Sequence, residues 1–251
     1  MKKAVGRGTQ EAGTTLANPP ILIPDNTRRP SAILSVLAAA GIVGPLLFTV
    51  GFVVQGFLRT DLRFGYNPVA QQISDLTAGP AGWVQQVNFV VFGLLLIAFA
   101  IGLLLGIRKT WPWGISSALV AWNGVELVIA GIFPLRQDTA GHIFDPLGVH
   151  SVNGTIFFLG IGVVLGVLSR QLARDELWRD LSAYTLISGV VVFVLVLLNG
   201  LLAERELSPL HPWLGLIQRA ILAVWFPCLI VLALRLRRLA RTGEQRGSGH
   251  V

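Results

Sequence analysis

The sequence predicts an all-α fold: a polytopic membrane protein built as a bundle of six transmembrane helices. Composition is the first indication, because hydrophobic residues make up 53% of the 251 residues, charged residues only 13%, and the mean hydropathy is +0.67. Such a chain has too little polar surface to cover a soluble globule. The second indication is that six segments are apolar over the roughly 20 residues that cross about 30 Å of hydrocarbon. The third is that basic residues alternate between the two sides of these segments, as membrane topology requires.

Residues 1–30 precede the first apolar segment and are predicted to form a disordered cytoplasmic tail. They are rich in Gly, Pro, Thr and Asn and lack the apolar periodicity that would bury a core. The apolar stretch that follows, residues 31–58, is far longer than the roughly 7 to 15 residues of a signal-peptide core. We therefore expect this stretch to stay in the protein as the first helix.

The transmembrane domain is expected to cover residues 31–238. Its six predicted spans are residues 31–58, 82–107, 114–133, 149–169, 181–203 and 212–236. Prolines agree with these limits, because Pro80 precedes the second span, Pro134 follows the third and Pro212 opens the sixth. Residues 239–251 are predicted to form a disordered, basic cytoplasmic tail.

The basic residues predict the orientation, since cytoplasmic loops retain Lys and Arg during insertion. One side of the bundle collects Lys2, Lys3, Arg7, Arg28, Arg29, Arg108, Lys109, Arg170, Arg174, Arg179, Arg235, Arg237, Arg238, Arg241 and Arg246. The other side carries only Arg59, Arg63, Arg136 and Arg205. We therefore expect a multi-pass protein of the cell (plasma) membrane with both termini in the cytoplasm and the lipid bilayer as its partner.

Several classes of function are disfavoured by the sequence. The net charge of +7 comes from short basic runs beside apolar segments, so we expect no nucleic-acid partner. Cys228 is the only cysteine, which excludes an intrachain disulfide and a thiolate metal cluster. There is no phosphate-binding glycine loop, nucleophile elbow or kinase motif, and we expect no cofactor. The oligomeric state does not follow from the sequence.

Polar residues inside the spans gather in the outer half of the predicted bundle. Asn123 and Glu126 lie three residues apart on one face of the third span. His150 and Asn153 repeat that spacing at the outer start of the fourth. The predicted polar cluster consists of Glu126, Arg219, Asn123, His150, Asn153, Gln218 and Asp75.

Glu126 and Arg219 are the two charges of this cluster inside the spans. Each lies seven residues from the outer end of its span, at Phe133 and Pro212, and so about 10 Å deep. A charge at that depth costs roughly 2.5 to 3.5 kcal/mol and normally has a partner. Either the two form an ion pair that sets helix register, which requires the third and sixth helices to be neighbours, or they line a pocket open to the outside. In such a pocket Glu126 would bind a cation or move a proton, and Arg219 would hold an anionic group.

The first outer loop carries a short apolar repeat. Val69, Ile73 and Leu76 recur at i, i+4 and i+7, which predicts a short amphipathic helix at the outer surface. This helix would either cap the pocket or only order a long loop. Asp75 within it would face either water or the bundle.

The second outer loop contains His142, Asp145 and His150. Their spacing matches no zinc signature, so we predict no metal site. Haem is also not expected, because His150 is the only histidine inside a predicted span and lies at its edge.

The outer loops resemble those of a known family. The segments that carry the resemblance are Tyr66-Asn67-Pro68, Ile73-Ser74-Asp75-Leu76, and Gly131-Ile132-Phe133-Pro134 with His150 opening the next span. They resemble the uncharacterised six-span prokaryotic membrane family called domain of unknown function 998, over about residues 41 to 236. The loop that contains His142 is longer here than in the family pattern. The resemblance implies the fold and topology, and no reaction comes with it.

Three functions fit these observations. The first is an integral membrane protein of unknown biochemical activity whose polar site in the outer half binds a lipid or small polar ligand from the outer side. The second is a structural or accessory membrane subunit without catalysis. The third is a secondary transporter, which would need a route through the inner leaflet, usually built from broken helices or internal repeats, and neither is evident.

Overall fold

The computed structural model describes residues 31–60, 65–106, 111–200 and 208–248. Six helices in these ranges are long and apolar enough to cross a membrane. They are α1 (Ser31–Thr60), α2 (Gly82–Gly106), α3 (Trp111–Ile132), α4 (Val149–Leu172), α5 (Ser182–Leu198) and α6 (Leu214–Ser248). Short 3-10 helices occur at η1 (Ile73–Thr77), η2 (Arg179–Leu181) and η4 (His211–Trp213). The predicted all-α bundle of six transmembrane helices is confirmed.

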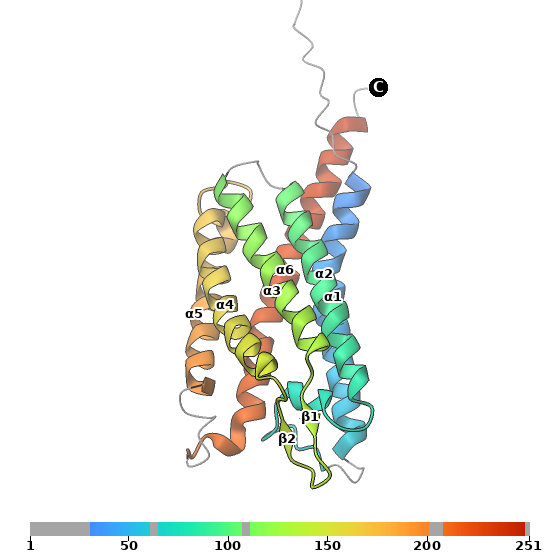
Figure 1. Cartoon of the computed structure of the whole chain (residues 1–251). Coiled ribbons are helices and arrows are strands. Elements are labelled where there is room, and N and C mark those ends of the chain that lie inside the picture. Colours follow the sequence, from blue (N-terminus) through green and yellow to red (C-terminus); the bar gives the residue numbers. More distant parts are fainter. Residues whose placement is uncertain (1–30, 61–64, 107–110, 201–207, 249–251) are drawn as a thin grey trace, which may run out of the picture.

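The helices pack in sequence order around a ring. Each contacts the next along the chain, and α6 closes the ring against α1. Aromatic rings fill the middle: the Phe92 ring lies 5.3 Å from that of Phe226 and 5.7 Å from that of Trp225, between centroids. The start of α1 and the end of α6 lie at the same end of the bundle, here called the tail end (Figure 1). The opposite end carries η1 and a β-hairpin and is called the capped end.

Glycines bring α2 and α3 into close contact. A Cβ added at Gly93 would lie 2.5 Å from the carbonyl oxygen of Gly124, and one added at Gly124 would lie 2.7 Å from that of Gly93. Two turns further along α3, a Cβ added at Gly131 would lie 2.6 Å from the carbonyl oxygen of Gln86. Because lipid tails provide no hydrophobic drive between helices, this close backbone packing is what joins the pair.

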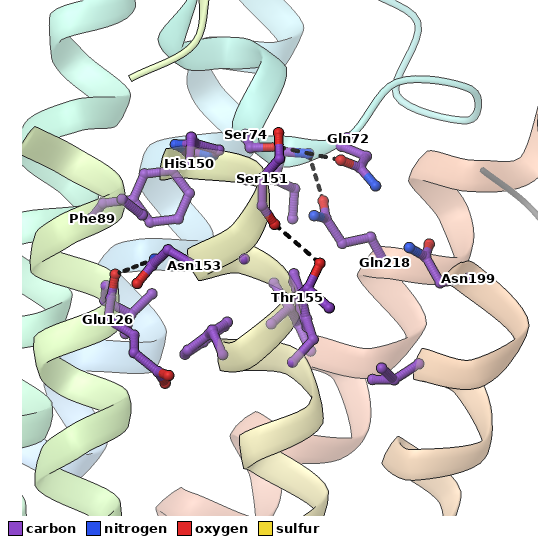
Figure 2. A pocket seen from close by; sticks show the side chains of 18 of the residues that line it. Gln72, Ser74, Phe89, Glu126, His150, Ser151, Asn153, Thr155, Asn199 and Gln218 are labelled. Carbon is purple, nitrogen blue, oxygen red and sulfur yellow. Dashed lines mark hydrogen bonds between the residues drawn. The ribbon is translucent and has the colours of Figure 1, made fainter. Parts of the chain in front are cut away.

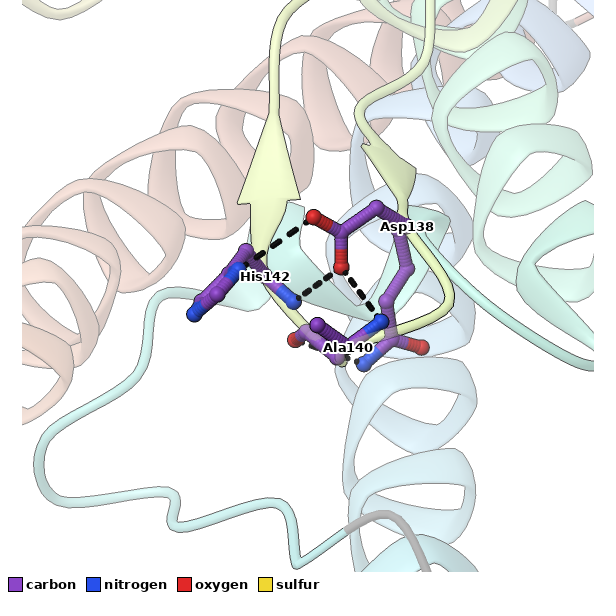
Figure 3. A network of polar contacts seen from close by, with 5 residues as sticks. Asp138, Ala140 and His142 are labelled. Carbon is purple, nitrogen blue, oxygen red and sulfur yellow. Dashed lines mark hydrogen bonds and ion pairs between the residues drawn. The ribbon is translucent and has the colours of Figure 1, made fainter.

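The second loop at the capped end contains a small hairpin. Strand β1 (Arg136–Gln137) pairs antiparallel with β2 (Ile143–Phe144). In its turn, Asp138 accepts hydrogen bonds from the N–H groups of Ala140 and His142, and its other oxygen lies 3.2 Å from His142 Nδ1 (Figure 3). Asp145 instead accepts from the N–H and hydroxyl of Ser151. His142, Asp145 and His150 therefore make separate local contacts and do not converge on one point.

Several predicted boundaries need correction. Helix α3 begins at Trp111, ahead of the apolar span that starts at Gly114 as predicted, and Pro112 falls in the first turn, where its missing N–H is tolerated. Helix α4 runs to Leu172, three residues beyond its predicted end. Helix α5 ends at Leu198, and residues 201–203 of the predicted span lie outside the described residues.

The largest correction concerns the C-terminal tail. Helix α6 continues to Ser248, so most of the segment predicted to be disordered, 239–251, is helical. Residues 236–242 are Leu, Arg, Ala and a single Thr, mostly good helix formers, and no proline interrupts them before Ser248. The predicted N-terminal tail, residues 1–30, lies outside the described residues.

Candidate functional site

The first loop folds back onto the capped end as a plug. We call residues 66–78 the cap. Ile73 and Leu76 are 2% and 0% exposed, whereas Val69 is 38% exposed. The predicted helix is present as the short η1, and Ile73 and Leu76 face the bundle. This burial favours the alternative in which the segment caps the bundle, because the two largest side chains of the repeat are removed from solvent there.

Helix α1 holds the cap through backbone carbonyls. Arg59 Nη1 donates to the carbonyl oxygens of Leu76 and Ala78, at 3.1 and 3.0 Å. One turn earlier, Gln55 Nε2 donates to the carbonyls of Leu76 and Ala81, at 3.1 and 3.0 Å. Arg59 is only 6% exposed. It therefore acts as a structural residue at the end of α1 and not as a loop charge.

Helix α6 holds the other side of the cap. Arg219 donates from Nη1 to the Gln71 carbonyl at 3.1 Å and from Nη2 to the Tyr66 hydroxyl at 2.5 Å. Its guanidinium also lies 5.8 and 5.9 Å from the ring centroids of Phe52 and Tyr66, within the range of cation–π attraction. The preceding residue, Gln218, accepts the N–H of Ile73 at 2.6 Å. Gln218 and Arg219 thus both bond to the cap.

Asp75 lies inside the cap between the two arginines. Its Oδ2 accepts the N–H of Gln72 at 2.8 Å. Burial raises the pKa of this carboxyl from 3.8 to about 6, while the Gln72 hydrogen bond and the charges of Arg219 and Arg59 oppose the rise. Burial also raises the pKa of Tyr66, against the pull of Arg219. Asp75 is thus turned toward the bundle and its arginines.

A second set of polar residues joins α3 to α4, and we call it the seam: Asn123, Glu126, His150 and Asn153. Asn123 Nδ2 donates to the Phe157 carbonyl at 3.3 Å, and Asn153 Nδ2 donates to the Glu126 carbonyl at 2.8 Å. His150 Nδ1 lies 2.9 Å from the Phe133 carbonyl and donates to it, since a carbonyl oxygen only accepts. The residues that share a face in the sequence therefore do meet, and their main partners are backbone carbonyls of the neighbouring helix.

The predicted ion pair between Glu126 and Arg219 is not formed. Glu126 accepts hydrogen bonds from Trp122 Nε1 at 2.8 Å and from Asn123 Nδ2 at 3.0 Å, whereas Arg219 bonds to the cap. The prediction required α3 and α6 to be neighbours. In the ring, α3 packs against α2 and α4, and α6 packs against α1 and α5.

A cavity of about 570 Å³ lies between the seam and the cap. Figure 2 shows Glu126, His150 and Asn153 of the seam on one side, and Gln72, Ser74 and Gln218 at the capped end. Further polar groups come from α4 and α5, at Ser151, Thr155 and Asn199. The remaining wall is apolar and combines aliphatic side chains with six aromatic rings: Phe48, Phe89, Phe92, Phe157, Phe158 and Trp225. The cavity is thus amphipathic.

The predicted polar cluster divides into three groups. Glu126, His150, Asn153 and Gln218 line the cavity. Asn123 supports it through its hydrogen bond to Glu126. Asp75 and Arg219 belong to the cap and do not line the cavity.

Sequence reasoning missed the aromatic wall and the role of Arg59. In the sequence of a membrane span, a phenylalanine that faces the cavity cannot be distinguished from one that faces lipid. The sequence did contain an indication for Arg59. The first apolar segment is longer than a bilayer requires and ends at this residue, so its last turn can extend beyond the hydrocarbon.

The fold and the cavity define a class: a six-span helical membrane protein with a capped, amphipathic cavity at one end. The chain belongs to the family described as "Protein of unknown function (DUF998)", whose model matches residues 42–235. Comparison with curated proteins and with solved structures finds no significant match. The resemblance of the outer loops is confirmed, and the family has no assigned reaction.

Proposed function

We propose that this is a plasma-membrane protein that binds a lipid or a small amphiphile in its cavity, with the capped end outside and both termini in the cytoplasm. The cavity itself carries the proposal. At about 570 Å³ it falls in the range of ligand sites, roughly 300 to 1,000 Å³. Its polar end suits a headgroup and its aromatic wall suits an alkyl chain.

The positions of the basic residues support this orientation. Arg170, Arg174 and Arg238 lie at or beside the tail end of α4 and α6, where a cytoplasmic face would collect them. Arg59 lies at the capped end, but its guanidinium is bonded to cap carbonyls and so is structural. This removes one of the few basic residues that opposed the assignment.

The polar lining is placed to hold a headgroup. Ser74 of the cap and Asn199 of α5 both line the cavity, and Ser151 and Thr155 present hydroxyls one helical turn apart on α4. Deeper in, Phe157 packs edge-on to Phe158 and Trp225, at 5.1 and 5.5 Å between centroids. If the headgroup of a ligand binds to the polar side chains, its alkyl chain lies against the rings of Phe157, Phe158 and Trp225.

Gly154 offers a direct test. It lines the cavity, and a Cβ built on it meets no atom within 4 Å, so the Cβ of Gly154→Leu fits without a clash and the larger side chain adds volume at the cavity wall. Gly166 on the same helix is equally open and does not line the cavity, which makes Gly166→Leu the matched control. The probe is dodecanol with a diazirine in its chain, crosslinked to the protein in dodecyl maltoside micelles and mapped by mass spectrometry.

Wild type and Gly166→Leu should label peptides that carry Phe157 and Trp225, and Gly154→Leu should lose most of that labelling. Equal labelling of all three proteins, or labelling spread evenly over the lipid-facing helices, would refute the proposal. That result would favour the accessory-subunit alternative. The seam supports this alternative, because its side chains bond to backbone carbonyls and need no ligand to do so.

A further inference from the structure

The charges around the cavity are one-sided. Among the described residues that line it, Glu126 is the only carboxylate, and none is lysine or arginine. His150 is the other ionisable group, and its Nδ1 is already bonded to the Phe133 carbonyl. The cavity lining therefore carries one carboxyl group and no fixed positive charge among these residues.

The nearby arginines do not supply the missing cation. Arg219 is directed to Gln71 and Tyr66, and Arg59 to the carbonyls of Leu76 and Ala78. Asp75 lies between them and offsets part of their charge on the cap side. An anionic headgroup in the cavity would meet Glu126 without a guanidinium to bind it.

Glu126 is itself incompletely matched. The residue is 1% exposed, and its carboxylate accepts the two hydrogen bonds from Trp122 and Asn123, both neutral donors. A carboxylate has about four acceptor positions, so these two donors leave about two of them unfilled. A charge at membrane depth is costly without a counter-charge, which a cationic ligand would provide.

Aromatic rings line the same cavity as Glu126. Phe157 is joined to the seam through its carbonyl bond with Asn123, and its ring lies 5.5 Å from that of Trp225. The Phe92 ring lies 5.7 Å from that of Trp225, between centroids. A cavity lined by one carboxyl group and several aromatic rings is the kind of site in which ammonium groups bind by charge and cation–π attraction.

We infer that the cavity selects amphiphiles with a cationic headgroup, a protonated amine or a quaternary ammonium. In this proposal Glu126 is the residue that recognises the positive charge. This inference rests on the proposed function and names its ligand class. The cationic head lies between Glu126 and the rings of Phe157 and Trp225. Phosphate-headed amphiphiles are disfavoured at the same position.

The test is competition against the diazirine-dodecanol probe in dodecyl maltoside micelles. The competitors share one chain length and differ in head charge: dodecyltrimethylammonium, dodecanol and dodecyl phosphate. For the wild type, the cationic competitor should displace the probe at a mole fraction about ten-fold lower than dodecanol, the size expected for a desolvated cation–π and charge contact. Dodecyl phosphate should be the weakest of the three.

Variants assign the preference to its residues. Glu126→Gln should bring the cation and dodecanol to within about two-fold of each other, while dodecanol still competes. Glu126→Asp should keep part of the preference. Trp225→Leu is a second, independent variant, which should weaken the cation more than dodecanol even if Glu126→Gln does not fold.

Each outcome bears on one proposal. Equal competition by all three amphiphiles, or a cation preference that survives both Glu126→Gln and Trp225→Leu, would overturn the inference and leave the ligand site standing. If no amphiphile competes, and if Gly154→Leu is labelled as strongly as the wild type, the proposed ligand site in the cavity is refuted.

Discussion

Arg219 should be coupled to Tyr66 and not to Glu126, and two double-mutant cycles that share Arg219→Gln test this. In the structure the Arg219 guanidinium bonds to the Gln71 carbonyl and the Tyr66 hydroxyl of the cap. Glu126 bonds to Trp122 and Asn123, so the two charges share no partner. The separation predicts opposite results for the two cycles.

The magnitudes follow from the contacts. Tyr66→Phe keeps the ring under the guanidinium and removes only the hydroxyl, so this cycle isolates the Nη2–Oη hydrogen bond. A hydrogen bond to a charged group contributes about 1.5 to 3 kcal/mol, and we expect a coupling energy of that order. Arg219→Gln alone also loses the Gln71 bond and the cation–π contacts, and should destabilise by about 2 to 4 kcal/mol. Glu126→Gln with Arg219→Gln should be additive within about 0.5 kcal/mol.

The assay is the unfolding free energy in dodecyl maltoside micelles for the three single variants and the two double variants. A Glu126–Arg219 coupling above about 1 kcal/mol would mean that the two charges interact after all, and that the ring order is wrong. Additive effects of Arg219→Gln and Tyr66→Phe would show that Arg219 does not interact with the Tyr66 hydroxyl.

The remaining predictions concern the cap, the helix packing and the topology. Because burial raises the pKa of Asp75 from 3.8 to about 6, the folded state holds this proton more tightly, and stability should fall by about 2 kcal/mol as the pH rises from about 4 through 6. Asp75→Asn should flatten that part of the wild-type pH profile of unfolding, and an unchanged profile would contradict the burial of its carboxyl. Gly93→Ala should destabilise by about 1 to 3 kcal/mol because its Cβ meets the α3 backbone, while Gly166→Ala should have no such cost; equal melting temperatures would argue against the close α2–α3 contact. A reporter active only in the cytoplasm should work when fused after Arg174 and fail when inserted at Ala140, and the reverse pattern would invert the proposed orientation.

The seam shows why part of the site was predictable. Asn123 and Glu126 are three residues apart on one helix, and His150 and Asn153 repeat that spacing on the next. Spacing along a helix determines which side chains share a face, and elements that are consecutive in the chain are usually neighbours in space. The proximity of these four side chains could therefore be predicted from local sequence. Their hydrogen-bond partners could not, because they are backbone carbonyls of the neighbouring helix, which every residue type carries.

The pairing of Glu126 and Arg219 shows the opposite case. Equal depth follows from counting residues along each helix, but depth does not say which helices are neighbours. The ring places α6 beside α1 and α5, and the cap brings Tyr66 and Gln71 to Arg219 first. The Arg219 guanidinium binds the Gly215 carbonyl of its own helix, and its other acceptors come from a loop far away in sequence.

By itself the sequence determined the number and approximate limits of the spans, the side of each polar residue and the membership of an all-α membrane class. These are properties of continuous segments, because burial in lipid acts on each stretch of about 20 residues separately. Only the tertiary structure decided that the first loop plugs the bundle, that Arg59 and Arg219 hold it, and that a cavity with one carboxylate and an aromatic wall lies beneath. Those features depend on the order of helices around the ring and on side-chain direction, and both are set by packing between segments far apart in the chain.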